Sequence, residues 1–294
     1  MTTDTADSGP PRGAGSGSGS DDGTTGNGGR KHLPVWQETI LLLAVALGLA
    51  VLIKAVFLQA FYIPSESMEP GLVKNDRILV QKVSYWFGKK PQRGDVVVFK
   101  DPGEWLGPQD DKGPTGLADA LSKVGLYPTG GHLVKRVIGT AGDVVVCCDD
   151  KGRISVNGKP LDEEDYVRHD PRGCDGFLDD YVTVRGTALA KPCSWTIGPI
   201  PDGKLFVMGD NRGHSADSRV HICSPDEDPC TSSPWVDTDL VVGKVFTLIW
   251  PQDRWRWIGR PDTFGGVPDN PPADLVKRAE DLEQKTEARR AAQR

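Results

Sequence analysis

The feature that most constrains this chain is a strongly apolar segment near its N-terminus. Residues 36–53 read WQETILLLAVALGLAVLI, so that every residue after Thr39 is apolar. With a helical rise of about 1.5 Å per residue, the segment is about 27 Å long, which just spans the hydrocarbon core of a bilayer. The sequence therefore predicts a transmembrane helix over residues 36–54.

A cleaved secretory signal is the alternative interpretation of this segment. Such a signal would have a shorter apolar core, would begin nearer Met1 and would be followed by a small-x-small cleavage site, which residues 57–64 do not offer. A retained anchor is therefore favoured. Arg30 and Lys31 precede the segment, which places the N-terminal tail in the cytoplasm, although Lys54 at the other end weakens this charge asymmetry.

The anchor divides the chain into parts of different composition. Residues 1–35, rich in Gly, Ser and Asp, bury too little apolar surface to offset chain entropy, and we expect a disordered cytoplasmic tail. Residues 55–260 are expected to form one extracytoplasmic domain, with a cap and insertions at 101–131 and 147–200. Residues 261–294 are expected to form a C-terminal tail, helical from Pro271 onward because apolar residues recur there at helical spacing.

The pattern beyond the anchor is that of a mainly β protein. Short runs rich in Val, Ile, Leu and Phe, most of them bounded by Gly, Pro or Asp, occur at residues 77–83, 95–99, 132–138, 143–146, 204–208 and 240–250. The pair Asn157-Gly158 predicts a tight hairpin turn. Residues 55–63 are rich in strand formers and end at Pro64, although a continuation of the helix to Ile63 is nearly as well supported.

Charge and cysteine content limit the partners and cofactors. A net charge of −6 with a pI near 5.4 gives no broad basic surface, so no nucleic acid is expected as a partner. Six cysteines all follow the anchor, and an even number on one side of a membrane indicates disulfides in an oxidising compartment. Zinc is the competing interpretation, but no Cys-x-x-Cys spacing occurs, so no metal is expected. The cysteines are Cys147, Cys148, Cys174, Cys193, Cys223 and Cys230.

Ser67 and Lys135 are the first candidates for chemistry. A serine is a weak nucleophile without a base, and neither a histidine triad nor a Gly-x-Ser-x-Gly elbow is recognisable in the folded part. Strand alternation puts Lys135 on one face with Leu133 and Val137, where an amine loses hydration and its pKa falls. The alternative, which the local sequence alone favours, is that Lys135 points to solvent beside Arg136.

A third candidate segment, residues 209–219, follows the strand at 204–208. Its sequence, GDNRGHSADSR, is dense in hydrogen-bond donors and acceptors, which is typical of a loop that supports a site. The alternative is ordinary turn chemistry, with Asp217 and Arg219 forming a simple ion pair.

Together these segments resemble type I signal peptidases. The resemblance rests on four motifs in the correct order, namely FYIPSESMEP at 61–70, RGDVVVF at 93–99, KRVIG at 135–139 and GDNRxxSxDSR at 209–219. It covers the chain from the anchor to about Trp250. It implies a mostly antiparallel β catalytic domain with a β-rich cap, behind a single transmembrane helix in the cell membrane. The implied activity is that of a serine endopeptidase that removes N-terminal signal peptides from exported precursor proteins after small residues, with no cofactor and no metal.

The resemblance also implies the roles of individual residues. Ser67 would be the nucleophile, and Lys135 the general base that later protonates the leaving amine. The Ser65 hydroxyl and the Ser67 backbone N–H would form the oxyanion hole. The support residues of the third segment would be Ser215, which forms a hydrogen bond with Lys135 and orients it, and the bracing residues Asp210, Arg212, Asp217 and Arg219. The partners are then exported precursors and the lipid bilayer.

The sequence departs from the family pattern after Arg219, where residues 221–231 read HICSPDEDPCT. We expect Cys223 and Cys230 to form a disulfide within this insert. Adjacent Cys147 and Cys148 are not expected to pair with each other, so each should reach Cys174 or Cys193.

Two other function classes remain open at this point. One is a related Ser-Lys peptidase with another substrate, such as a maturation protease for conjugation or a self-cleaving repressor. The other is a non-catalytic membrane-anchored β domain. The predicted anchor argues against a repressor bound to DNA. A dead scaffold would need none of Ser67, Lys135 and Ser215.

Overall fold

The structure of the chain is a computed structural model, which describes residues 34–292 apart from a set of internal positions. Those positions are 87, 104, 107–115, 117–130, 150, 170–194 and 223–232. The chain divides within its first helix into two compact units, Met1–Ala46 and Leu47–Arg294. Most of the predicted insertion at 101–131, and the predicted disulfide between Cys223 and Cys230, therefore lie outside the described residues.

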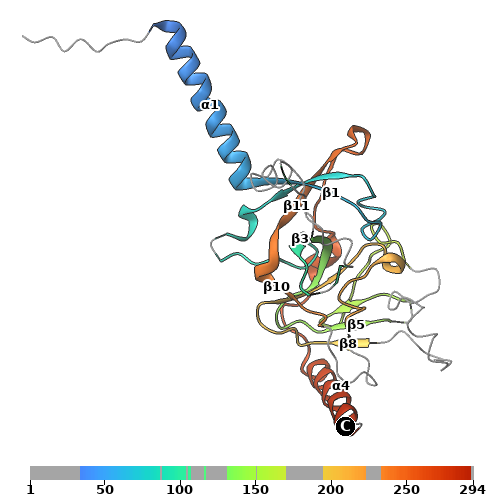
Figure 1. The fold of residues 1–294 in the computed structure, drawn as a ribbon. Helices are drawn as coiled ribbons and strands as arrows, with labels where there is room; N and C mark the ends of the chain where they lie inside the picture. The colour runs from blue at the N-terminus through green and yellow to red at the C-terminus, as the bar shows by residue number, and fades with distance from the viewer. Residues whose placement is uncertain are drawn as a thin grey trace, which may run out of the picture. The chain divides into compact units, whose positions relative to one another are not determined.

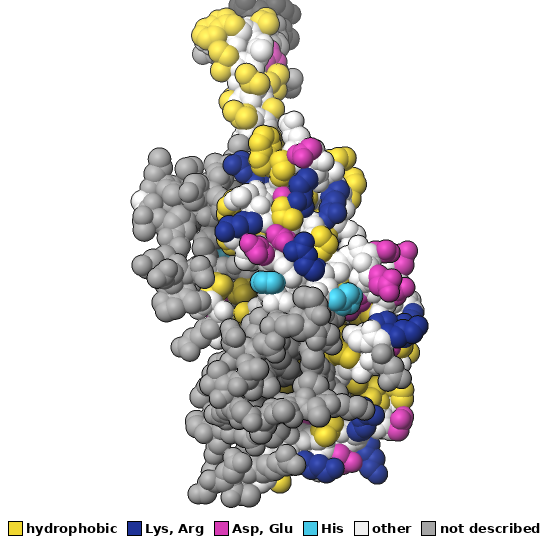
Figure 2. All heavy atoms as spheres, turned by 90° about the vertical axis from the view of Figure 1, so that its right-hand side faces the viewer, with side chains coloured by type: hydrophobic (Ala, Val, Ile, Leu, Met, Phe, Trp, Pro, Cys, Tyr) yellow, Lys and Arg dark blue, Asp and Glu magenta, His cyan; other side chains and the backbone are white. Residues whose placement is uncertain are grey.

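Helix α1 (Val35–Phe57) occupies the predicted apolar segment. Its described aliphatic side chains are exposed, for example Leu42 at 63%, and the part of α1 turned to the viewer in Figure 2 is largely hydrophobic. In the part of the chain that the structure describes, no helix is both long enough and apolar enough to cross a membrane. The helix ends at Phe57 and strand β1 follows at once, so residues 55–63 are divided between the two predicted alternatives.

An eight-stranded sheet, antiparallel at every pairing, carries most of the predicted strands (Figure 1). Its strands are joined in the order β1-β2-β11-β3-β4-β9-β10, and β12 pairs with β11. The bounds are β1 (Leu58–Tyr62), β2 (Arg77–Gln81), β3 (Val96–Lys100), β4 (His132–Gly139), β9 (Lys204–Met208), β10 (Val236–Asp237), β11 (Val241–Trp250) and β12 (Arg256–Trp257). The predicted mainly β, mostly antiparallel fold is confirmed for the part of the chain that follows α1.

A smaller antiparallel sheet has the strand order β7-β6-β5-β8. Its strands are β5 (Val145–Cys147), β6 (Ser155–Val156), β7 (Lys159–Pro160) and β8 (Trp195–Ile197). The turn between β6 and β7 is the predicted hairpin, because Asn157 and Gly158 both have positive φ, at 52° and 81°. Helix α4 (Ala273–Ala292) confirms the predicted C-terminal helix and contacts β8 (Figure 1).

Five short 3-10 helices complete the described elements. They are η1 (Val83–Tyr85), η2 (Arg212–His214), η3 (Thr238–Leu240), η4 (Gln252–Arg254) and η5 (Asp262–Gly266). Of these, η2 lies inside the loop at 209–219 that the sequence marks as a candidate part of the site.

The large sheet separates two hydrophobic clusters, because the side chains of a strand alternate between its faces. In β3, Val96 and Val98 belong to one cluster, whereas Val97 and Phe99 belong to the other. Lys135 in β4 is the register partner of Val97 and therefore lies on the face of the second cluster. This register decides the environment of the predicted base.

The prediction that Cys147 and Cys148 do not pair with each other is wrong. The two form a disulfide with one another, and the peptide bond between them is cis. Because the two residues are adjacent in the chain, this pairing needs no contribution from a distant segment. The expected partners Cys174 and Cys193 lie outside the described residues.

Candidate active site

Ser67 and Lys135 meet in the structure. Ser67 lies in the loop that follows β1, which we call the nucleophile loop (residues 64–72), and Lys135 lies in the middle of β4. Lys135 Nζ is 2.7 Å from Ser67 Oγ and donates a hydrogen bond to it. Only 6% of Ser67 and 4% of Lys135 is exposed, so the pair is withdrawn from bulk water. A nucleophile and a base in direct contact are the requirement for nucleophilic catalysis by a serine.

The environment of Lys135 prepares its amine to act as a base. Burial lowers its pKa to about 8, the Asp217 and Asp210 carboxylates oppose this shift, and the Arg219 guanidinium adds to it. The solvent-facing orientation that the local sequence favours is therefore wrong, and the burial inferred from Leu133 and Val137 is right. Both of these neighbours belong to the hydrophobic cluster on the Lys135 face of the sheet.

The nucleophile loop is held by backbone contacts from a second loop, residues 209–219, which we call the support loop. The Asn211 N–H donates to the Ser67 carbonyl over 3.0 Å, and Asn211 Nδ2 donates to the Glu66 carbonyl over the same distance. Within the nucleophile loop, Leu72 N–H donates to the Met68 carbonyl at 2.8 Å. These bonds fix the backbone on both sides of the Ser67 side chain.

Ser65 lies beside Ser67. Its Oγ is 3.3 Å from Ser67 Oγ, and the residue is exposed. The oxyanion role of Ser65 stays a prediction.

Ser215, Asp217 and Arg219 form one buried cluster next to Lys135. Ser215 Oγ donates to Asp217 Oδ2 at 2.6 Å, and Arg219 donates to both oxygens of the same carboxylate through Nε and Nη2, at 2.8 Å each. Burial alone would raise the pKa of Asp217, but the charge and hydrogen bonds of Arg219, together with those from Ser215 and Gly209, lower it to about 2. The acid is therefore ionised at neutral pH. The predicted hydrogen bond from Ser215 to Lys135 stays a prediction.

Gly209, the first residue of the support loop, lies directly against the nucleophile loop, and no sequence signal marked it for this purpose. A Cβ at this position would overlap both the Ser67 carbonyl oxygen and the Ser215 side chain. Its N–H also donates to Asp217 Oδ2 at 2.9 Å. The close approach of the nucleophile loop to Ser215 therefore depends on the absence of a side chain here.

The two bracing residues Asp210 and Arg212 each use a partner that sequence analysis missed. Arg136 donates to Asp210 through Nε at 2.8 Å and through Nη2 at 2.6 Å. Arg212 donates in the same bidentate manner to Glu163, at 3.0 and 2.7 Å. Arg136 could have been found from its place beside Lys135 in the KRVIG motif. Glu163 has no such signal, because it is distant in sequence from all four motifs.

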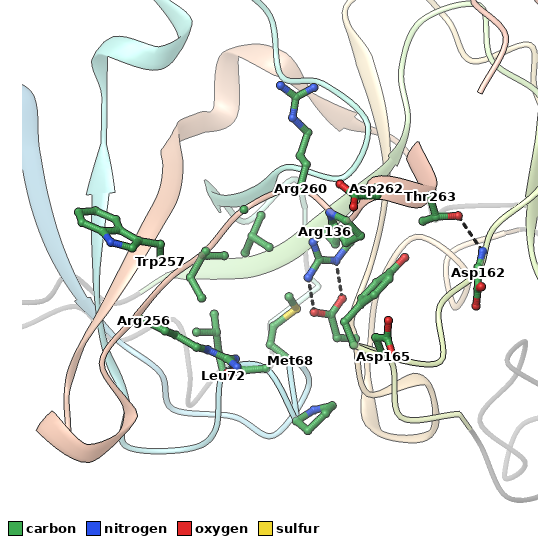
Figure 3. Close-up of a pocket in the computed structure, with 18 of the residues that line it drawn as sticks. Met68, Leu72, Arg136, Asp162, Asp165, Arg256, Trp257, Arg260, Asp262 and Thr263 are labelled. Atoms are coloured by element: carbon green, nitrogen blue, oxygen red, sulfur yellow. Dashed lines mark hydrogen bonds and ion pairs between the residues drawn. The ribbon is translucent and has the colours of Figure 1, made fainter. Parts of the chain in front are cut away.

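A cavity of about 800 Å³ lies next to this arrangement (Figure 3). Its walls include Met68, Arg136 and Asp210, which are the direct chain neighbours of Ser67, Lys135 and Gly209. Neighbouring residues of a strand point to opposite faces, so Arg136 and the cavity lie on the face of β4 away from Lys135. The remaining walls come from Val96, from residues 70–72 and 256–263, and from Lys159, Pro160, Asp162, Asp165 and Tyr166.

Comparison with known proteins identifies the family to which this arrangement belongs. The family described as signal peptidase, peptidase S26, matches residues 36–250. The chain belongs to this family. The four motifs that resemble signal peptidases all lie inside these bounds, and the match ends at Trp250, as the sequence predicts. The resemblance inferred from the motifs is thereby confirmed.

Relatives within the signal peptidase family match most of the chain. The probable signal peptidase I of Mycobacterium leprae is 38% identical over 257 residues, which are 81% of this chain and 83% of the relative. The signal peptidase I of Mycobacterium tuberculosis is 38% identical over 243 residues, 76% of each chain. The probable signal peptidase I-1 of Synechocystis is 33% identical and covers 76% of this chain and 89% of its own length.

Proposed function

We propose that the chain is a signal peptidase I, a serine endopeptidase that removes signal peptides from precursor proteins, with Ser67 as nucleophile and Lys135 as general base. Membership of the signal peptidase family supports the activity. The observation that carries the residue assignment is the contact of 2.7 Å between Lys135 Nζ and Ser67 Oγ, inside a site that lowers the pKa of the amine.

The chemistry follows from this contact. Neutral Lys135 accepts the proton of Ser67 Oγ as the oxygen attacks the scissile carbonyl, and the Ser65 hydroxyl with the Ser67 N–H stabilises the resulting oxyanion. The ammonium of Lys135 then gives its proton to the leaving amine, which breaks the peptide bond and leaves an acyl-Ser67 ester. Lys135 next deprotonates a water molecule, and hydrolysis of the ester releases the signal peptide and restores Ser67.

The support loop supplies the electrostatics of these steps. Ionised Asp217 holds Ser215 and Arg219 in place and moderates the effect of burial on the amine of Lys135. Without this negative charge, the ammonium intermediate would be a buried and poorly compensated cation. Asp217 therefore keeps the pKa of Lys135 in the range in which the amine both accepts and returns a proton.

Substrate binding and membrane attachment complete the proposal. The precursor binds as an extended strand beside the segment that ends at Pro64 and beside the strand around Lys135, with small residues before the cut. Residues 36–54 anchor the enzyme in the lipid bilayer, residues 1–35 are cytoplasmic, and the peptidase domain at 55–260 is extracytoplasmic. Protease treatment of intact and of opened cells tests this orientation, because an extracytoplasmic domain is cleaved in both.

A cleavage assay with the full chain in detergent tests the activity. The purified protein is incubated with an exported precursor, and the new N-terminus of the product is sequenced. Cleavage after a small-x-small sequence is expected for the wild type, and Ser67→Ala should abolish it while the far-UV circular dichroism stays the same. Cleavage at normal rates by Ser67→Ala would refute the assignment of the nucleophile.

A further inference from the structure

Residues 163–168, which we call the strap, connect the smaller sheet with both loops of the site. Val167 forms an antiparallel bridge with Pro70 in the nucleophile loop. The Arg168 N–H donates to the Asp210 carbonyl in the support loop over 2.8 Å. The strap therefore contacts the backbone of both loops by which the site is built.

Glu163 is the buried end of this strap. Its carboxylate accepts both hydrogen bonds from Arg212, and the side chains of this ion pair are 1% and 0% exposed. Tyr166 Oη also donates to Glu163 Oε1 at 3.1 Å. A guanidinium that donates through both terminal nitrogens to one carboxylate has a fixed orientation. Glu163 therefore sets the direction of the remaining N–H groups of Arg212.

One of those groups reaches the site. Arg212 Nε donates to the Gly209 carbonyl at 3.1 Å. Gly209 in turn packs so closely against the Ser67 carbonyl and the Ser215 side chain that a Cβ would overlap both. A continuous series of contacts therefore leads from Glu163 to Ser67. A buried ion pair gives little net stability compared with apolar residues of the same size, so stability alone does not account for this one.

We propose that Glu163 is a positioning residue for the cleavage reaction, acting through Arg212 and Gly209 on the alignment of Ser67 with Lys135. The inference rests on the proposed function. Because only 2% of Glu163 is exposed, the residue has no surface for substrate, and its loss should change kcat and not KM. Misplacing a catalytic group by about 1 Å from a distance lowers the rate by about 100-fold, so Glu163→Gln should lower kcat by about 10- to 100-fold.

The control is a second buried ion pair of the same kind. Asp143 accepts Arg93 on both carboxylate oxygens, with 0% of the acid side chain exposed, and none of its described contacts reaches the nucleophile loop or the support loop. Asp143→Asn should therefore lower the melting temperature while leaving the kcat of the folded enzyme unchanged.

A double variant separates positioning from stability. Glu163→Met with Arg212→Met replaces the ion pair with apolar side chains, which removes the buried charges but also the hydrogen bond to Gly209. The melting temperature should stay near that of the wild type while kcat remains low. If Glu163→Gln does not fold, this double variant tests the proposal in its place.

The experiment measures kcat, KM and melting temperature for the full chain in detergent, with wild type and Ser67→Ala alongside. Low kcat at unchanged KM in the Glu163 variants, with normal kcat in Asp143→Asn, supports the inference. Wild-type kcat in a folded Glu163 variant, or an equal loss in Asp143→Asn, overturns it. An inactive wild type, or an active Ser67→Ala, would instead overturn the proposed function.

Discussion

Lowering the pH from 9 to 6 should reduce the kcat/KM of this enzyme by about 90-fold. The reason is that the pKa of Lys135 falls from 10.5 to about 8 on burial, and only the neutral amine can accept the proton of Ser67. At pH 8 about half of the enzyme then carries a neutral amine, about 150-fold more than an unperturbed lysine would provide. The shift corresponds to about 3 kcal/mol of free energy that disfavours the ammonium in the folded state.

The same shift predicts an effect on stability, with a definite sign. The folded pKa lies below the unfolded one, so between pH 8 and 10.5 the unfolded chain binds more protons and the free energy of unfolding rises with pH. Below pH 8 the full cost of about 3 kcal/mol applies. Lys135→Met should therefore stabilise the fold at pH 7, and this gain should shrink as the pH approaches 10.5.

Two measurements check this reasoning about Lys135. One is kcat/KM of the wild type between pH 5 and 10, and the other is urea unfolding of wild type and Lys135→Met at pH 7 and pH 10. Lys135→Arg should be inactive at every pH, because a guanidinium stays protonated. An acidic optimum, or an active Lys135→Arg enzyme, would refute the assignment of Lys135 as the base.

Three further predictions concern the oxyanion hole, the loop contact and the cysteines. Ser65→Ala should lower kcat by about 10²- to 10³-fold with little change in KM, and an unchanged kcat would remove Ser65 from the oxyanion hole. Gly209→Ala should lower both activity and melting temperature, because its Cβ would overlap the Ser67 carbonyl and Ser215, whereas the exposed Gly259, with open space around it, should accept alanine without loss. Mass spectrometry of unreduced protein from an oxidising compartment should find all six cysteines in disulfides, including the pair between Cys147 and Cys148, and six free thiols would contradict the extracytoplasmic placement.

Local sequence determined the elements of this protein and the identity of its family. Short apolar runs bounded by Gly, Pro or Asp located most strands of the large sheet, and Asn157-Gly158 located a hairpin, because both signals act between residues close in sequence. The four motifs predicted that Ser67 and Lys135 act as a pair only when they were taken together, because each segment alone also has an ordinary structural interpretation. The helix-to-strand change at Phe57 was not predictable, since both structures suit these apolar residues about equally well.

Tertiary structure decided the environment and the partners of the site residues. In the sequence, Leu133 and Val137 favour a buried Lys135, whereas the adjacent Arg136 favours an exposed one. The pairing of Lys135 with Val97 settles this choice, because it places Lys135 on the face of a hydrophobic cluster. Likewise, Ser215 donates to Asp217, and Arg212 is oriented by Glu163, which is distant from it in sequence. Burial, and with it the pKa of an amine, depends on the atoms that the fold brings around a residue, and these come from segments that sequence patterns do not connect.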